Sequence, residues 1–225
     1  MSAEIRHGRH RTPRRRLRLG IAAAVSAVCL IVGGIVVINE IPHSEATVAD
    51  LNGNPVQVDE DQVPTVSQKQ AMRAVSSTGE RFAIPAVGLD VQLGEVSAVD
   101  GSVVPPGFTS VYRVRNRGVS LAQAGTGTVY LVTHSVRGGG LAPGNYVEDP
   151  ATGTSTLTPG TAILVGDQRY EVTTTQTIPK DQMASNTPTW ANVPNRLVLI
   201  TCLQNKHGTP STHNLVITAV RTTGG

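Results

Sequence analysis

The chain has 225 residues with only 3% aromatic side chains, and its many valines and threonines favour a small β-rich core over a helical bundle. The formal net charge is +3, but seven arginines lie between Arg6 and Arg18, and residues 20–225 hold 12 basic and 15 acidic side chains, a balance of −3. The body of the protein is therefore mildly acidic, and a nucleic-acid partner is not expected.

Residues 1–18 form a basic arm, and residues 19–38 follow as an apolar segment without any charged side chain. About 20 residues of helix cross the roughly 30 Å hydrocarbon core of a bilayer, so a transmembrane anchor is expected there. The preceding arginines place the arm in the cytoplasm and the rest outside, which predicts a single-pass protein of the cell membrane, with lipid around its anchor. The alternative is a signal peptide cleaved near Ser44 and Ala46, although its apolar region is usually about 7–15 residues long.

Residues 39–80 are polar and contain Pro42, Pro55 and Pro64, without a sustained apolar period. This composition is typical of an extracytoplasmic stalk, with a short helix around Ser67–Val75.

From Arg81 to the C-terminus, short β-type runs alternate with glycine and proline. Seven or eight such runs in one domain, residues 81–225, predict an all-β fold with a closed or nearly closed barrel. Little helix is expected, with Lys180–Ser185 as one short candidate. The expected strands are Arg81–Ile84, Val91–Val99, Gly127–Thr133, Thr161–Val165, Arg169–Ile178, Arg196–Thr201 and Asn214–Val220.

Two apolar strands each end in a side chain that can take part in catalysis. The segment TVYLVTH ends at His134, and RLVLITC ends at Cys202. If the two strands are neighbours, their ends form a Cys–His pair, with a thiolate nucleophile and a general acid/base. Cys29 lies in the apolar segment, so a disulfide to Cys202 is not expected, and a free thiol outside the cell calls for a function. The alternative without catalysis is that Cys202 is a small buried side chain at a strand end and that His134 is an ordinary hydrogen-bonded polar residue.

The order of several segments resembles that of the sortase family, across essentially the whole chain. The overall pattern is most similar to the actinobacterial class E and F types. The resemblance rests on the basic arm with one anchor, RFAIPAVGLDVQLGEV (Arg81–Val96), GTVYLVTHS (Gly127–Ser135), AILVGDQRYEVTTT (Ala162–Thr175) and LVLITC (Leu197–Cys202).

This resemblance implies a sortase-like eight-stranded β-barrel and a cysteine transpeptidase. Its substrates would be proteins with a C-terminal sorting signal related to Leu-Pro-X-Thr-Gly. A thioacyl intermediate on Cys202 would pass to an amine acceptor, such as a peptidoglycan precursor or a pilin lysine, and His134 would transfer protons. Sortases usually carry an arginine at the start of the last strand, where this chain has Asn214, whose amide donates hydrogen bonds but has no charge.

The expected catalytic residues are thus Cys202, His134 and Asn214. The expected substrate-binding residues are their neighbours Thr201 and Ser135 and the loop residues His207 and Thr212. No cofactor is expected. No metal is expected either, because the carboxylates Glu95, Asp100, Glu148 and Asp149 are scattered and lack an EF-hand-like spacing.

Three other functions remain open from the sequence. Asn214 also fits a weak or inactive sortase-like barrel that binds sorting-type peptides. A different exported cysteine enzyme, such as a peptidoglycan transpeptidase, lacks support because its Ser-His-Gly-Cys arrangement is absent. A membrane-tethered structural β-domain with an incidental cysteine is the third.

Overall fold

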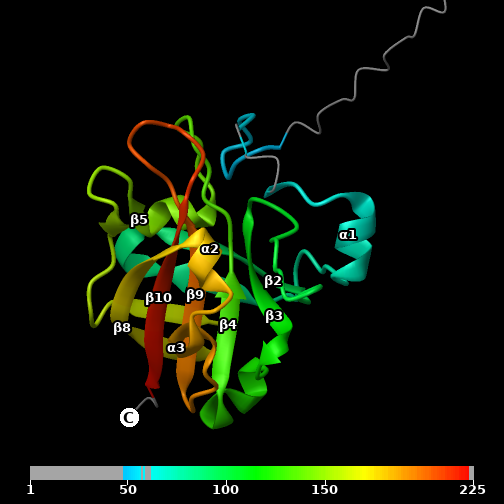
Figure 1. Cartoon of the computed structure of the whole chain (residues 1–225). Helices are drawn as coiled ribbons and strands as arrows, with labels where there is room; N and C mark the ends of the chain where they lie inside the picture. Colours follow the sequence, from blue (N-terminus) through cyan, green and yellow to red (C-terminus); the bar gives the residue numbers. More distant parts are fainter. Residues whose placement is uncertain (1–47, 57, 59–61, 223–225) are drawn as a thin grey trace, which may run out of the picture. The chain divides into compact units, whose positions relative to one another are not determined.

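The computed structural model describes residues 48–56, 58 and 62–222. They belong to the unit Ser44–Gly225, and a separate unit comprises Met1–His43. Eight strands form a closed barrel in the order β1-β2-β3-β4-β9-β10-β8-β7 (Figure 1), which confirms the expected all-β barrel. The barrel strands are β1 Arg81–Ile84, β2 Leu89–Val96, β3 Ser110–Gly118, β4 Thr128–Val132, β7 Ala162–Val165, β8 Gln168–Pro179, β9 Arg196–Leu203 and β10 His213–Thr222.

The other described elements are short. They comprise the strand pair β5 Glu148–Asp149 and β6 Thr154–Ser155, and the helices α1 Val66–Ala71, η2 Pro85–Val87, η3 Leu121–Thr126, η4 Pro143–Tyr146, α2 Lys180–Met183 and α3 Thr187–Trp190. None of the helices in this part of the chain is long and apolar enough to cross a membrane. The expected anchor, residues 19–38, lies outside the described residues.

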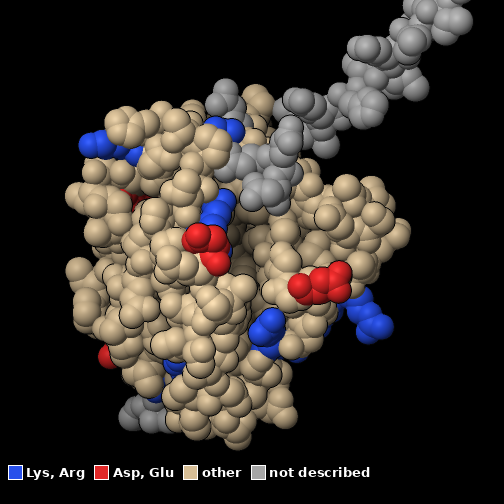
Figure 2. Space-filling model, in the orientation of Figure 1, with Lys and Arg blue, Asp and Glu red and all other residues tan. Residues whose placement is uncertain are grey.

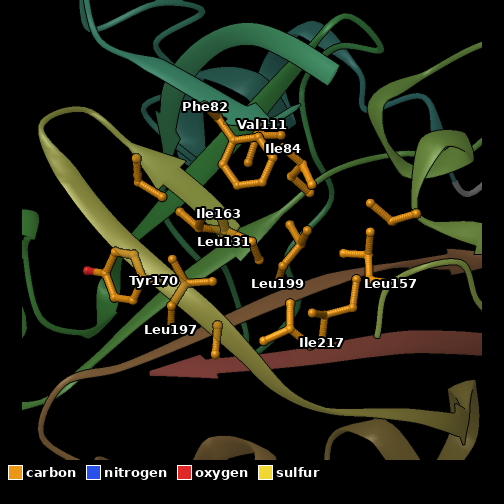
Figure 3. Close-up of a cluster of buried hydrophobic side chains, with 14 of the residues drawn as sticks. Phe82, Ile84, Val111, Leu131, Leu157, Ile163, Tyr170, Leu197, Leu199 and Ile217 are labelled. Atoms are coloured by element: carbon orange, nitrogen blue, oxygen red, sulfur yellow. The ribbon is translucent and has the colours of Figure 1, made fainter. Parts of the chain in front are cut away.

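Alternation along the strands places apolar side chains on both faces of the sheet. On β9, Leu197 and Leu199 belong to the cluster that fills the barrel (Figure 3), whereas Val198 and Ile200 belong to a second cluster outside it, with Met183 of α2. Each fully buried aliphatic side chain stabilises the fold by roughly 1.5–3 kcal/mol. The outer cluster explains why the β9 sequence is continuously apolar, since both of its faces are covered.

Strand β3 is the one barrel strand that the sequence did not predict. Its middle reads Arg113, Val114, Arg115, and these two charged side chains hide the alternation with valine. In the structure Glu95 of β2 forms ion pairs with both arginines, and Val114 is fully buried. Pairing with β2 therefore gives the arginines of β3 an acidic partner, whereas the charged sequence of β3 by itself is typical of a loop.

The described part of the expected stalk packs on the barrel instead of extending from it. The N–H of Leu51 donates to the carbonyl of Leu141 at 2.8 Å, and Val75 exchanges backbone hydrogen bonds with Glu95 of β2 at 2.8 Å. Four valines of this stretch pack against a small buried cluster that contains Phe108. These valines are Val48, Val56, Val58 and Val63.

The short helix expected around Ser67–Val75 is present as α1. Thr65 caps its N-terminus, because the Thr65 hydroxyl accepts a hydrogen bond from the N–H of Gln68 and the Gln68 side chain accepts one from the N–H of Thr65. Such a reciprocal cap satisfies two backbone donors at the start of a helix. The helix is followed by Met72, which is buried against the outer face of the barrel.

Candidate active site

The strand order brings His134, Cys202 and Asn214 side by side. Strands β4 and β9 are parallel, and the last pair in their register joins Val132 to Ile200, so His134 and Cys202 each follow two residues further on. Strands β9 and β10 are antiparallel, and their register pairs Cys202 directly with Asn214. Since side chains alternate along a strand, all three lie on the outer face of the barrel, as Val132 and Ile200 do.

The three side chains line one cavity of about 490 Å³, which is within the usual range of ligand pockets, about 300–1,000 Å³. The loop of residues 100–105, between β2 and β3, forms another part of its lining. Charged side chains are sparse on the face of the molecule seen in Figure 2. The apolar lining residues include Val103, Val104, Val132, Met183, Trp190 and Ile200.

His134 is held by contacts on two sides. Its ring stacks on Phe108 with the ring centroids 4.1 Å apart, and its Nε2 atom lies 2.8 Å from the carbonyl oxygen of Pro105. Because a carbonyl oxygen only accepts hydrogen bonds, Nε2 is the atom that bears the hydrogen, and the lone pair of the neutral ring is on Nδ1. Only 2% of His134 is exposed, so the imidazole is oriented before any substrate binds.

Cys202 is half-buried and is the one cysteine among the described residues. The side-chain amide of Gln62 donates a hydrogen bond to the Cys202 sulfur at 3.4 Å. An N–H donor favours the thiolate over the neutral thiol, and the thiolate is the form that acts as a nucleophile. Sequence reasoning missed Gln62, since it precedes Cys202 by 140 residues in the chain.

Asn214 supplies an uncharged amide to the cavity at the position opposite Cys202. Its neighbour His213 faces the other way, as alternation predicts, and its Nδ1 atom lies 2.9 Å from the Thr212 hydroxyl. The cationic residues in the cavity lining are Arg117, which the sequence did not single out, and Lys180 at the start of α2. Arg117 lies on β3 with its guanidinium carbon 5.1 Å from the centroid of a Trp190 ring.

The expected substrate-binding residues occupy different positions. Thr201 borders the cavity, but its hydroxyl is buried on the inner side of β9, and Ser135 is fully buried. His207 and Thr212 are exposed on the loop after β9 and do not line the cavity. The structure thus gathers the three expected catalytic residues around one cavity, with Thr201 at its border, and does not place Ser135, His207 and Thr212 in its lining.

The four acidic residues that were considered as metal ligands differ in their surroundings. Glu95 is paired with arginines, Asp100 lines the cavity, and Asp149 accepts hydrogen bonds within its own turn. Glu148 is only 3% exposed, and burial raises its pKa to about 7 although three hydrogen bonds act to lower it. A buried carboxyl beside a reactive cavity is unusual enough to suggest a role.

The geometry is suited to acyl transfer through a covalent intermediate. A Cys202 thiolate can attack a carbonyl, His134 can donate and accept the protons of an amine, and the Asn214 amide can donate a hydrogen bond to a developing oxyanion.

No protein-family model matches the chain, and no curated protein matches it. Among solved structures it is similar in fold to sortase A of Listeria monocytogenes, with a TM-score of 0.46 and 19% identity over 66% of this chain and 88% of that one. Sortase C-1 of Actinomyces oris gives a TM-score of 0.43 and 19% identity over 64% and 73%. A lid mutant of sortase A from Corynebacterium diphtheriae gives a TM-score of 0.45 and 17% identity over 65% of this chain and 70% of that one. The resemblance to classes E and F stays a prediction.

A glycine behind the site gives a first prediction. The N–H of Gly144 donates to the carbonyl of His134 at 2.8 Å, and an added Cβ would lie 2.7 Å from that oxygen and would also meet the hydroxyl of Thr201. We expect Gly144→Ala to lower the free energy of unfolding in urea by about 1–3 kcal/mol, the usual cost of overpacking. Gly125→Ala is the control, since its nearest new contact is an ordinary 3.6 Å. Equal stability of the two variants would contradict this packing.

Proposed function

We propose that this protein is a membrane-anchored cysteine transpeptidase of the sortase type. The proposal rests on the row formed by His134, Cys202 and Asn214 along three adjacent strands, facing one cavity. Two residues of this row, His134 and Cys202, lie in the segments that resemble sortases in the sequence. The barrel topology supports the proposal because it positions a strand-end thiol beside a strand-end imidazole.

In the proposed reaction, the Cys202 thiol first gives its proton to the lone pair of His134, and the resulting thiolate attacks the threonine carbonyl of a sorting signal related to Leu-Pro-X-Thr-Gly. The C–N bond to glycine breaks as His134 protonates the departing amine, which leaves a thioester on Cys202. An incoming amine then attacks the thioester, gives a proton to His134 and restores the thiolate. The Asn214 amide donates a hydrogen bond to the oxyanion in both steps.

The partners follow from this reaction. The substrates are proteins with a C-terminal sorting signal, and the acceptor is an amine such as that of a peptidoglycan precursor or a pilin lysine. Residues 19–38 anchor the protein in the cell membrane with the basic arm in the cytoplasm, which holds the catalytic unit on the side where exported substrates arrive.

The full-length protein in detergent, incubated with a library of sorting-signal peptides and an amine, tests the proposal. Mass spectrometry should detect a thioacyl adduct on the peptide that contains Cys202, and an amine-linked product. If every library member gives neither adduct nor product while the protein is folded, the enzymatic proposal is wrong.

A second function is favoured by one observation, the neutral Asn214 opposite the thiol. The alternative is a weak or inactive sortase-like barrel that binds sorting-type peptides without turning them over. Peptide binding measured by fluorescence anisotropy, without any adduct by mass spectrometry, would support it.

Substitutions at Asn214 separate the two functions. If its amide stabilises the oxyanion, Asn214→Ala should lower kcat/KM by roughly 10²–10³, the effect of losing one oxyanion-hole donor, or about 2.7–4 kcal/mol. Asn214→Arg should then keep or raise the rate. An alanine variant as fast as the parent would exclude the proposed role, and an active arginine variant beside an inactive parent would favour the peptide-binding function.

A further inference from the structure

A buried carboxyl joins the ends of the two strands that lead to the catalytic pair. Glu148 accepts a hydrogen bond from the backbone N–H of Gln204 at 2.6 Å and one from the side-chain amide of Asn145 at 2.7 Å. The Ser135 hydroxyl oxygen lies 3.4 Å from the same carboxyl. Ser135 directly follows His134, and Gln204 follows Cys202 by two residues, so Glu148 contacts both chain segments just beyond the reactive residues.

Further hydrogen bonds join the same two segments to each other. The Ser135 hydroxyl donates to the carbonyl oxygen of Cys202 at 2.6 Å, and the side-chain amide of Gln204 donates to the carbonyl oxygen of Ser135 at 2.9 Å. Ser135 is fully buried and Gln204 is 5% exposed. Hydrogen bonds in such a water-excluded place are stronger than exposed ones, and an unmade one is costly.

We propose that Glu148 is a positioning residue, which fastens the segments after β4 and β9 together and adjusts the reactivity of Cys202 through its own proton. This inference rests on the proposed function, since it assigns a role toward the same catalytic pair. A purely structural site would be filled more cheaply by an apolar side chain, because burying a carboxyl costs free energy even when it is hydrogen-bonded.

The proton matters because the two forms of Glu148 form different hydrogen bonds. Desolvation raises the pKa of Glu148 to about 7, and the bonds from Gln204, Asn145 and Ser135 offset this only in part. Below that pH the acid can donate to the Ser135 oxygen, whose hydrogen then remains directed at the carbonyl of Cys202. Above it the carboxylate competes for that hydrogen and adds a negative charge that is linked to the Cys202 backbone through the Ser135 hydroxyl, which disfavours a second charge on the sulfur.

The hydrogen bonds of the Glu148 carboxyl come from Gln204, Asn145 and Ser135, none of which is ionisable. The ionisable side chains on the surrounding elements are His134, Arg137, Tyr146, Asp149, Cys202, Lys206 and His207.

The test compares Glu148→Gln with the parent, and with Asp149→Asn as the matched control on the same strand. Full-length protein is alkylated with iodoacetamide from pH 5.5 to 8.5, and mass spectrometry follows the peptide with Cys202 separately from that with Cys29. We expect the midpoint of the Cys202 rate profile to fall by about 0.5–1 pH unit in Glu148→Gln, corresponding to about a three- to tenfold change in thiol ionisation. Asp149→Asn should leave the midpoint unchanged.

Turnover on one sorting peptide provides the second measurement. Glu148→Ala should lower kcat at least about tenfold with KM nearly unchanged, because it disturbs the pair without touching the peptide. Should that variant fail to fold, Ser135→Ala keeps the carboxyl and removes only the hydroxyl that joins it to Cys202, and should lower kcat about threefold or more.

If the alkylation profiles of the parent and Glu148→Gln coincide, the proposed role of Glu148 is wrong. The same holds if the Cys202 thiol is inert in both proteins. A parent without turnover whose alkylation profile still shifts in Glu148→Gln would contradict the transpeptidase proposal and leave the coupling of Glu148 to Cys202 intact. The two failures are thus distinguishable.

Discussion

Cys202→Ala is expected to abolish thioacyl adduct formation and turnover while leaving the barrel folded. The thiol is the one nucleophile of the reaction, and alanine offers no atom to form the thioester. The sulfur lies on the outer face of β9 and is half-buried, outside the cluster that fills the barrel, so its removal should cost little stability. Mass spectrometry of the peptide adduct and a thermal melt measure the two effects in one preparation.

Cys29→Ala is the matched control, because it removes the only other cysteine of the chain. We expect it to retain parental turnover. Residual turnover in Cys202→Ala, or its loss in Cys29→Ala, would show that the nucleophile is assigned to the wrong residue.

His134→Ala is expected to lower kcat/KM by about 10²–10⁴, the usual contribution of a general acid/base. The nitrogen of the departing glycine is a poor leaving group unless it is protonated as the C–N bond breaks, and the substitution removes the proton donor. The alanine variant also loses the stacking on Phe108 and the hydrogen bond to Pro105. A thermal melt is therefore needed beside the kinetics, to separate lost stability from lost catalysis.

Two variants sharpen this test. His134→Gln can keep an N–H donor toward the Pro105 carbonyl but cannot exchange protons, so it should be as slow as alanine yet more stable. His213→Ala removes an imidazole from the start of β10 that faces away from Asn214, and should leave kcat/KM unchanged. If His134→Gln retained nearly parental turnover, His134 would have a structural role only.

Local sequence patterns predicted the strand ends well. The runs that lead to His134 and Cys202 are almost continuously apolar, because both of their faces are covered, and each of these two residues lies within two residues of the end of its strand. The period of two also assigned His213 and Asn214 to opposite faces of β10, as the structure has them. These features depend on neighbouring residues alone, so they can be read without knowing the strand order.

The strand β3 and the carboxyl of Glu148 could not be read in that way. The arginines of β3 become favourable only beside Glu95, and Glu148 looks like a solvated loop residue until Gln204 and Ser135 are brought around it. Both depend on partners that are far away in the chain. Composition and periodicity contain no information about such partners.

The sequence by itself determined an all-β chain with a thiol and an imidazole near the ends of two separate apolar strands. Only the tertiary structure decided that β4 and β9 are parallel neighbours, that Asn214 lies opposite Cys202, and that Gln62 donates to the sulfur. The physical reason is that strand formation follows from local alternation, whereas strand order and register follow from closing the barrel around one shared core, to which every strand contributes.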